Sequence, residues 1–271
     1  MGNTSIDARL TDKIHKISVD LLQEKGIDDL VKISTLGDGS CYFHSFLRAT
    51  KMGYIRGTEQ ERKEIVNEFR HTLANLLLKK NDKGVTNYEK LGDGKLKEFS
   101  GEGVYEYSLN TLINDLINNR TTDGIYQSLI SDNTNFDVYI LYLTKVKGNR
   151  YFNEIFGDLP NDISYVELNE YINPHFNNYD IPSNNYDTLG HYNYSDKFKI
   201  YPSVPHEKLS SIYKRRNSVI LLFHADLQHY ECVGKIKYVL HDGKYVGLIN
   251  TIFSHEDPII QTLYKHIMKI R

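Results

Sequence analysis

The residues of this chain that could do chemistry are a cysteine and a histidine that lie far apart in the sequence. Cys41 follows the glycine-containing turn Gly37-Asp38-Gly39-Ser40 and opens a segment that is typical of a helix. The start of a helix offers N–H groups without intrahelical acceptors and the positive end of the helix dipole, and both favour thiolate over thiol. Cys41 is therefore a candidate nucleophile, provided that the fold brings a base to it.

A cysteine nucleophile needs an imidazole to hold its proton and a third polar group to fix the tautomer of that imidazole. His229 follows an apolar run, Val219 to Phe223, and is expected to lie on a strand of its own. Glu231 comes two residues later, so its side chain should lie on the same face of that strand, close enough to accept an imidazole N–H. His229 and Glu231 are therefore the candidate base and the candidate third residue.

Other histidines and the second cysteine offer competing interpretations. His44 would project from the same helix as Cys41, where such a residue more often packs or caps. His224 and His241 stand near strand ends, and His224 is the substitute base if His229 faces away. Cys232 lies on an apolar strand with no glycine turn before it, so we expect it in the core, where free cysteine behaves as a small hydrophobe.

Two motifs in this order resemble the ovarian-tumour (OTU) family of cysteine deubiquitinases. They are Asp38-Gly39-Ser40-Cys41-Tyr42-Phe43-His44 and His229-Tyr230-Glu231, and the resemblance covers roughly residues 27–235. It implies that Cys41 is the nucleophile and His229 the general base. It also implies that Asp38 shapes the loop whose N–H groups, with that of Cys41, stabilise the oxyanion. Glu231 stands where the family usually has Asp or Asn, so its longer side chain either orients the imidazole or points elsewhere.

The resemblance implies a thiol protease that hydrolyses the isopeptide bond between ubiquitin, or a ubiquitin-like modifier, and lysine. It implies ubiquitin or polyubiquitin chains as partners, no metal or organic cofactor, and a monomer. The alternative from another class is a catalytically weak or inactive ubiquitin-binding module that keeps the OTU fold. A papain-like protease that cuts peptide bonds ranks last, because that family's cysteine is typically followed by Trp and this chain has none.

Composition and charge narrow the remaining possibilities. The chain has 271 residues, 40% of them hydrophobic, which is enough for one large domain. No apolar run is long enough to cross a bilayer, and no signal peptide is visible, so we expect neither a membrane nor a secreted protein. Two cysteines suit a reducing compartment, and a net charge of −2 argues against nucleic acid. We expect an intracellular, cytoplasmic protein, which means the host cytoplasm if the source is a large DNA virus or an intracellular bacterium.

The expected fold class is α/β of the α+β type, a papain-like OTU fold with a small central sheet flanked by helices. Residues 1–26 should form an N-terminal helix packed on a catalytic domain of residues 27–271, with a C-terminal hairpin and helix at about 237–271. Apolar periodicity predicts helices over residues 7–25, 41–51, 58–80, 109–117, 125–131 and 258–270. Apolar β-branched runs predict strands over residues 136–143, 218–223, 228–236, 238–240 and 245–249.

Residues 144–216 form an expected insertion that is rich in Tyr, Asn and Asp. Tyrosine is enriched at protein interfaces, and loops of this length within a domain are unusual. The insertion is either an embellishment packed on the surface or a contact for ubiquitin.

Overall fold

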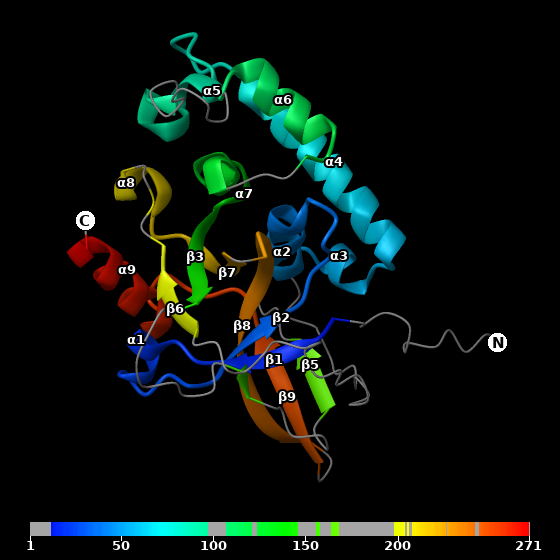
Figure 1. The fold of residues 1–271 in the computed structure, drawn as a ribbon, viewed down its shortest axis with the longest axis vertical. Helices are drawn as coiled ribbons and strands as arrows, with labels where there is room; N and C mark the ends of the chain where they lie inside the picture. The colour runs from blue at the N-terminus through cyan, green and yellow to red at the C-terminus, as the bar shows by residue number, and fades with distance from the viewer. Residues whose placement is uncertain are drawn as a thin grey trace, which may run out of the picture.

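A mixed β-sheet with helices on both faces forms the centre of the molecule (Figure 1). The structure, a computed structural model, describes residues 12–96, 107–120, 124–145, 156–157, 164–167, 198–203, 205, 208–225, 227–241 and 244–270. The predicted α/β class is confirmed, with α2 packed on strands β7 and β8. The sheet is larger than the small one predicted, since nine strands lie within the described residues.

The strands follow the order β4-β1-β2-β8-β7-β3-β6 across the sheet, and β9 extends it by pairing with both β8 and β5. Strands β3 and β7 are parallel, as are β5 and β9, and the other pairs are antiparallel. Their bounds are β1 Ile14–Ile17, β2 Leu30–Ile33, β3 Phe136–Lys145, β4 Phe156–Gly157, β5 Ser164–Glu167, β6 Phe198–Pro202, β7 Asn217–His224, β8 His229–His241 and β9 Lys244–Asn250.

The helices divide between the two faces of the sheet. One core contains residues of α2, α4, α6 and α7, and the other contains residues of α1, α8 and α9 (Figure 1). None of the described helices combines the length and apolar character required to cross a membrane. The bounds are α1 Asp20–Gln23, α2 Cys41–Thr50, α3 Met52–Arg56, α4 Glu59–Leu78, α5 Asn87–Lys90, η2 Leu91–Gly94, α6 Leu109–Ile117, η4 Gly124–Tyr126, α7 Gln127–Thr134, α8 Leu209–Ile212 and α9 Pro258–Ile270.

Strand β7 shows why this sheet has two cores. Its successive side chains point to opposite faces, so Val219 and Leu221 join the core beneath α2 while Ile220 and Leu222 join the other. A strand covered on both faces must be apolar throughout, which explains the uninterrupted apolar run in the sequence. Strands β7 and β8 therefore lie in the middle of the molecule, where they form a rigid support for His229.

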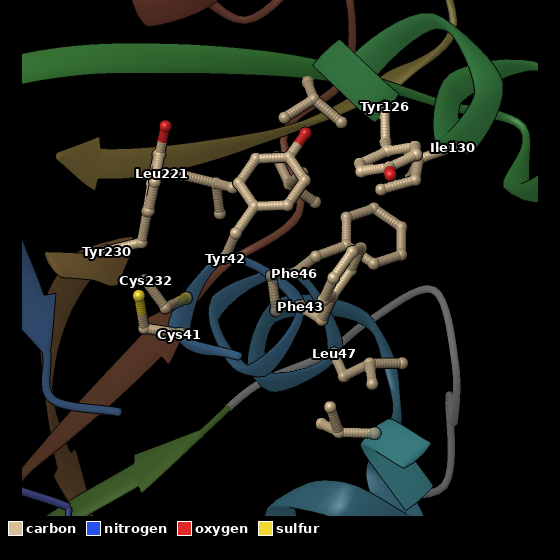
Figure 2. Packing of buried hydrophobic residues seen from close by; sticks show 14 of the residues in the cluster. Cys41, Tyr42, Phe43, Phe46, Leu47, Tyr126, Ile130, Leu221, Tyr230 and Cys232 are labelled. Atoms are coloured by element: carbon tan, nitrogen blue, oxygen red, sulfur yellow. The ribbon is translucent and has the colours of Figure 1, made fainter. Parts of the chain in front are cut away.

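Helix α2 presents an aromatic face to this support. Phe43, Phe46 and Leu47 are buried, as predicted, and Figure 2 shows Phe43 beside Tyr126. Tyr42 makes an edge contact with Tyr230 of β8, with ring centroids 5.0 Å apart. These contacts fix the position of the first turn of α2, which begins at Cys41.

Most of the predicted elements are confirmed. Helix α9 has the predicted bounds, α2 and α6 match within a residue, and β3 pairs with β7 as expected. Helix α4 begins with the predicted capping box, in which the Thr58 side chain accepts from the Glu61 N–H and the Glu61 carboxylate accepts from the Thr58 N–H. The β8–β9 hairpin is also present, although its turn at Asp242 and Gly243 lies outside the described residues.

The predicted helix over residues 7–25 is wrong in its described part. Residues Ile14–Ile17 form strand β1, and only Asp20–Gln23 is helical. The apolar residues at helical spacing include β-branched ones, and pairing of Ile14 with Ile33 on β2 satisfies the backbone in the extended form. Tertiary pairing thus overrides a weak helical pattern, and Ile14–Ile17 belongs to the sheet.

The predicted insertion at residues 144–216 falls largely outside the described residues. Its described pieces belong to the main fold, because β6 pairs with β3, β4 with β1 and β5 with β9, while α8 packs in one core. The described pieces of this segment are therefore part of the domain. Whether its tyrosines contact ubiquitin stays a prediction.

Strand β8 turns from its partners β2 and β7 toward β9 at a glycine, which gives a test of the packing. A Cβ at Gly234 would lie 2.6 Å from Ile249 Cγ2 and 3.2 Å from the Asn250 backbone oxygen. Gly234→Ala should therefore lower the free energy of unfolding by about 1–3 kcal/mol through overpacking, as measured by urea denaturation.

The matched control is Gly53→Ala in α3. Gly53 is exposed, and a Cβ there would meet nothing within 4 Å. This substitution should raise the free energy of unfolding by up to about 1 kcal/mol, because alanine favours the helix. Equal destabilisation by both changes would contradict the close packing at Gly234.

Candidate active site

The turn before α2 is shaped by one glycine and one carboxylate. Gly39 has a φ of +84°, in the left-handed region that side chains rarely adopt. Asp38 Oδ1 accepts the Ser40 N–H at 3.0 Å, which closes the turn just before Cys41. Asp38 therefore shapes this loop locally, and the N–H of Ser40 is already engaged by it.

His44 holds this carboxylate from within α2. Its Nε2 donates to Asp38 at 3.1 Å, and its Nδ1 lies 2.6 Å from the Tyr54 hydroxyl. The hydrogen bond from His44 lowers the pKa of Asp38 to about 2, against the opposing effect of partial burial. His44 was expected only to pack or cap. Its three-residue spacing from Cys41, almost one helical turn, is the signal that it lies over the turn.

Ser40 is the N-cap residue of α2, yet its hydroxyl makes no capping hydrogen bond. Its Oγ instead accepts from Arg70 Nη1 at 3.0 Å. Arg70 is completely buried and also donates to backbone carbonyls of Asp115, Leu116 and Arg120. The serine hydroxyl is thus held by Arg70, so it does not cap the N–H groups of the first turn of α2.

Cys41 lies between the start of α2 and the start of β8. Its Sγ is 3.9 Å from the backbone oxygen of Gln228, the residue before His229, and Figure 2 shows its place beside the aromatic cluster. Only 5% of the residue is exposed, and burial raises the pKa of the Cys41 thiol. Backbone N–H groups, that of Tyr230 foremost, oppose this shift without reversing it.

The helix start favours the thiolate as expected, but burial outweighs this effect at Cys41. Removal of the sulfur from water disfavours its charged form more than the helix terminus favours it. A nucleophilic role for Cys41 would therefore require a base that accepts the thiol proton.

His229 is the first residue of β8 and is half-buried. Its ring faces the turn before α2, because a Cβ at Gly37 would lie 4.0 Å from His229 Cε1. Burial lowers the pKa of His229, while the charge of Glu231 acts to raise it. A neutral imidazole is able to accept the proton of a neutral thiol, so the two groups suit general-base activation.

Glu231 shares a face of β8 with His229, as predicted, but its carboxylate is bound elsewhere. It accepts two hydrogen bonds from Lys32 Nζ, at 2.8 and 3.0 Å, and one from His224 Nε2. Within the described residues, no hydrogen bond reaches the His229 ring. The carboxylate thus receives an imidazole N–H from His224 in place of His229, because the longer glutamate side chain extends to the neighbouring strands.

The electrostatics of Glu231 follow from these partners. Burial acts to raise its pKa, but the hydrogen bond from His224 and the charge of Lys32 lower the pKa to about 2. The network of Lys32, Glu231 and His224 was not predicted. A lysine within the apolar run Leu30–Ile33 is the one sequence signal that could have suggested it.

The remaining candidates are also placed. Cys232 is fully buried in the core, as predicted. His224 is buried at the end of β7, with its ring centroid 6.3 Å from that of His229. The side chain of His241 lies outside the described residues. Among the residues that the structure describes, no three His, Cys, Asp or Glu side chains gather closely enough to hold a metal ion.

Comparisons with known proteins find a likeness among solved structures. A scan against protein-family models finds no match, and a search of the curated proteins finds none either. The chain is similar to an OTU deubiquitinase from Wolbachia pipientis wMel, solved bound to ubiquitin, with a TM-score of 0.37 and 11% identity. The likeness covers 76% of this chain and 96% of that chain. At this level of likeness, the roles of Cys41 and His229 have to be inferred from the geometry of this chain.

The raised pKa of Cys41 predicts a distinctive pH dependence of alkylation. The rate of reaction of Cys41 with iodoacetamide, followed by mass spectrometry, should still rise near pH 9, because only the thiolate reacts. Cys41→Ala should remove this modification, because the cysteine that then remains is the buried Cys232. A rate that reaches its plateau below pH 7 would contradict a resting thiol and would indicate a thiolate–imidazolium pair.

The lowered pKa of Glu231 predicts acid sensitivity. A carboxylate whose folded-state pKa lies below its ordinary value of 4.5 contributes stability above that value and loses it as the pH falls toward about 2. Glu231→Gln should therefore flatten the dependence of the free energy of unfolding on pH between about 4.5 and 2. The exposed Glu256→Gln serves as control, and an unchanged slope in Glu231→Gln would contradict the lowered pKa.

Proposed function

We propose that this chain is a cysteine-type deubiquitinase that hydrolyses the isopeptide bond between ubiquitin, or a ubiquitin-like modifier, and lysine. The observation that carries the proposal is the contact of the Cys41 thiol with the backbone at the start of β8, one residue before His229. The proposed substrate rests on the resemblance of the two motifs to those of the OTU family. An intracellular location and a monomeric state belong to the same proposal.

The proposed chemistry begins from the neutral pair. His229 takes the proton of Cys41 as the sulfur attacks the carbonyl carbon of the C-terminal glycine of ubiquitin. The resulting tetrahedral intermediate collapses, the lysine amine leaves with the proton from His229, and a thioester remains on Cys41. Water, deprotonated by His229, then hydrolyses the thioester and restores the thiol.

The negative charge of the intermediate needs hydrogen-bond donors. The Cys41 N–H belongs to the first turn of α2, where such groups have no intrahelical acceptor. The residue before it, Ser40, is held at two points. Asp38 accepts the Ser40 N–H, and Arg70 donates to the Ser40 hydroxyl. In this proposal Asp38 is a positioning residue for the oxyanion donors, and preorganised donors of this kind are worth about 10²–10³ in rate.

A second candidate is a ubiquitin-binding module with weak or no catalytic activity. Two observations favour it: Glu231 hydrogen-bonds Lys32 and His224, and burial raises the pKa of the Cys41 thiol. Both features would lower the rate of catalysis. The fold and the two motifs do not distinguish the candidates, because both candidates share them. Ubiquitin binding without turnover of any diubiquitin linkage would favour this candidate.

A ubiquitin probe with a C-terminal electrophile tests the proposed function. It should label the wild-type protein at Cys41 and should not label Cys41→Ala. His229→Gln should slow labelling by about 10²–10⁴, the usual contribution of a general base. Cys232→Ala is the matched control, since it removes the other buried thiol and should leave labelling intact. Labelling that survives in Cys41→Ala would refute the assignment.

A further inference from the structure

We propose that Lys32 and His224 are positioning residues for His229, and that they act through the Glu231 carboxylate, which they hold between them. The inference rests on the proposed function, since it names further residues that the same Cys41–His229 reaction requires. It gives Glu231 a role that differs from a direct hydrogen bond to the catalytic imidazole.

The network spans three neighbouring strands at the end of the sheet that carries His229. Glu231 of β8 lies opposite Leu222 of β7, and His229 lies opposite His224. On the other side of β8, Lys32 of β2 lies opposite Val233. Lys32 and His224 are therefore the diagonal neighbours of Glu231 on the two flanking strands, within reach of a long side chain.

All of these side chains point to one face of the sheet. Residues 229, 231 and 233 of β8 alternate with Tyr230 and Cys232, which belong to the core beneath α2. At this strand end the His229 ring also faces the turn before α2. The network therefore acts on the candidate site through the strand end that carries His229.

Burial makes this network sensitive to the loss of any member. Lys32 is 2% exposed, and His224 and Glu231 are each 5% exposed. A buried ion pair adds little net stability compared with apolar residues of the same volume, but removal of one partner leaves an uncompensated charge. We therefore expect the network to act mainly on the position and charge of neighbouring residues. Among these, His229 belongs to the candidate active site.

The charges around His229 come from several elements. Glu231 on its own strand raises the pKa of His229, and His224 on β7, Lys32 on β2 and His44 on α2 lower it, while burial lowers it most. Cys41 and Asp38 lie on the α2 side. Lys32 and His224 balance Glu231, so the network keeps a carboxylate near His229 without allowing its full charge to act on the imidazole.

The same arrangement leaves the His229 ring to face the catalytic turn. If Glu231 were released from Lys32, its carboxylate would compete for the imidazole two residues away on the same face. Lys32 on β2 and His224 on β7 therefore hold the carboxylate so that it supports the end of the strand without a hydrogen bond to the His229 imidazole. The longer glutamate suits this purpose, because it extends to both flanking strands.

The test compares Lys32→Met, Glu231→Gln, the double variant and Lys32→Arg in the full chain. With a ubiquitin C-terminal amide substrate, each single variant should lower kcat by about tenfold with KM unchanged, because misplacement of a catalytic group costs up to about 10²-fold. The loss in the double variant should not exceed that of the worse single variant, since both changes break one network. Lys32→Arg, which keeps the charge, should recover most of the rate.

Lys235→Met is the matched control. Lys235 lies on β8 and pairs with Asp29 at 3.5 Å, outside the network, so kcat should not change. If Lys32→Met fails to fold, the comparison is made with Glu231→Gln, Lys32→Arg and the double variant. The double variant should fold, because it leaves no uncompensated buried charge. Losses that multiply in the double variant, or single variants with unchanged kcat, would overturn the proposal.

A second measurement does not need ubiquitin. The ring resonances of His229 in the free protein, assigned with His229→Gln, report its tautomer and its titration midpoint by NMR. Lys32→Met should raise that midpoint and Lys235→Met should not. An unchanged His229 titration in Lys32→Met would overturn the inference. A wild-type protein that fails to cleave ubiquitin would refute the proposed function alone, because the NMR titration tests the network by itself.

Discussion

The contact between the first turn of α2 and the first residues of β8 is the constraint on which the rest of the site depends. It joins residues almost 190 positions apart in the chain, and it places the Cys41 sulfur 3.9 Å from the backbone of Gln228. No local sequence preference could create such a contact. The contact exists because β8 is held between β2 and β7, and because the aromatic residues of α2 are buried against that sheet.

Three buried cationic or imidazole side chains stabilise the polar parts of this contact. Arg70 holds the Ser40 hydroxyl, His44 holds the Asp38 carboxylate, and Lys32 holds Glu231. A buried charged or polar group is costly unless it is paired, so each of these groups restricts its partner to one arrangement. The turn before Cys41 is thus fixed from α4 and α2, and the strand end at His229 is fixed from β2 and β7.

Much of the fold, and part of the site, could be predicted from the sequence. Helices α4 and α9 and strands β3 and β7 have strong apolar patterns, and Cys41 and His229 stand in recognisable motifs. Strand β1 was missed because Ile14 and Ile17 also fit a helical spacing, and only pairing with β2 decides between the two. The partners of Glu231 were missed because they lie on different strands, and the register that brings Lys32 and His224 beside it is a property of the assembled sheet.

The resting site combines two neutral groups, and this has a consequence for how the reaction would start. Burial raises the pKa of Cys41 and lowers that of His229, so both shifts favour the thiol and the imidazole over the ion pair. A thiol of this kind reacts slowly with small electrophiles, because the thiolate is the nucleophile. In the proposed reaction, a carbonyl bound at the start of α2 changes this balance, since N–H groups at the start of a helix stabilise the negative charge that forms on its oxygen. Under the proposed function, charge separation would become favourable only with a substrate in place, so the burial that suppresses the free thiol would also direct its reactivity to a bound acyl group.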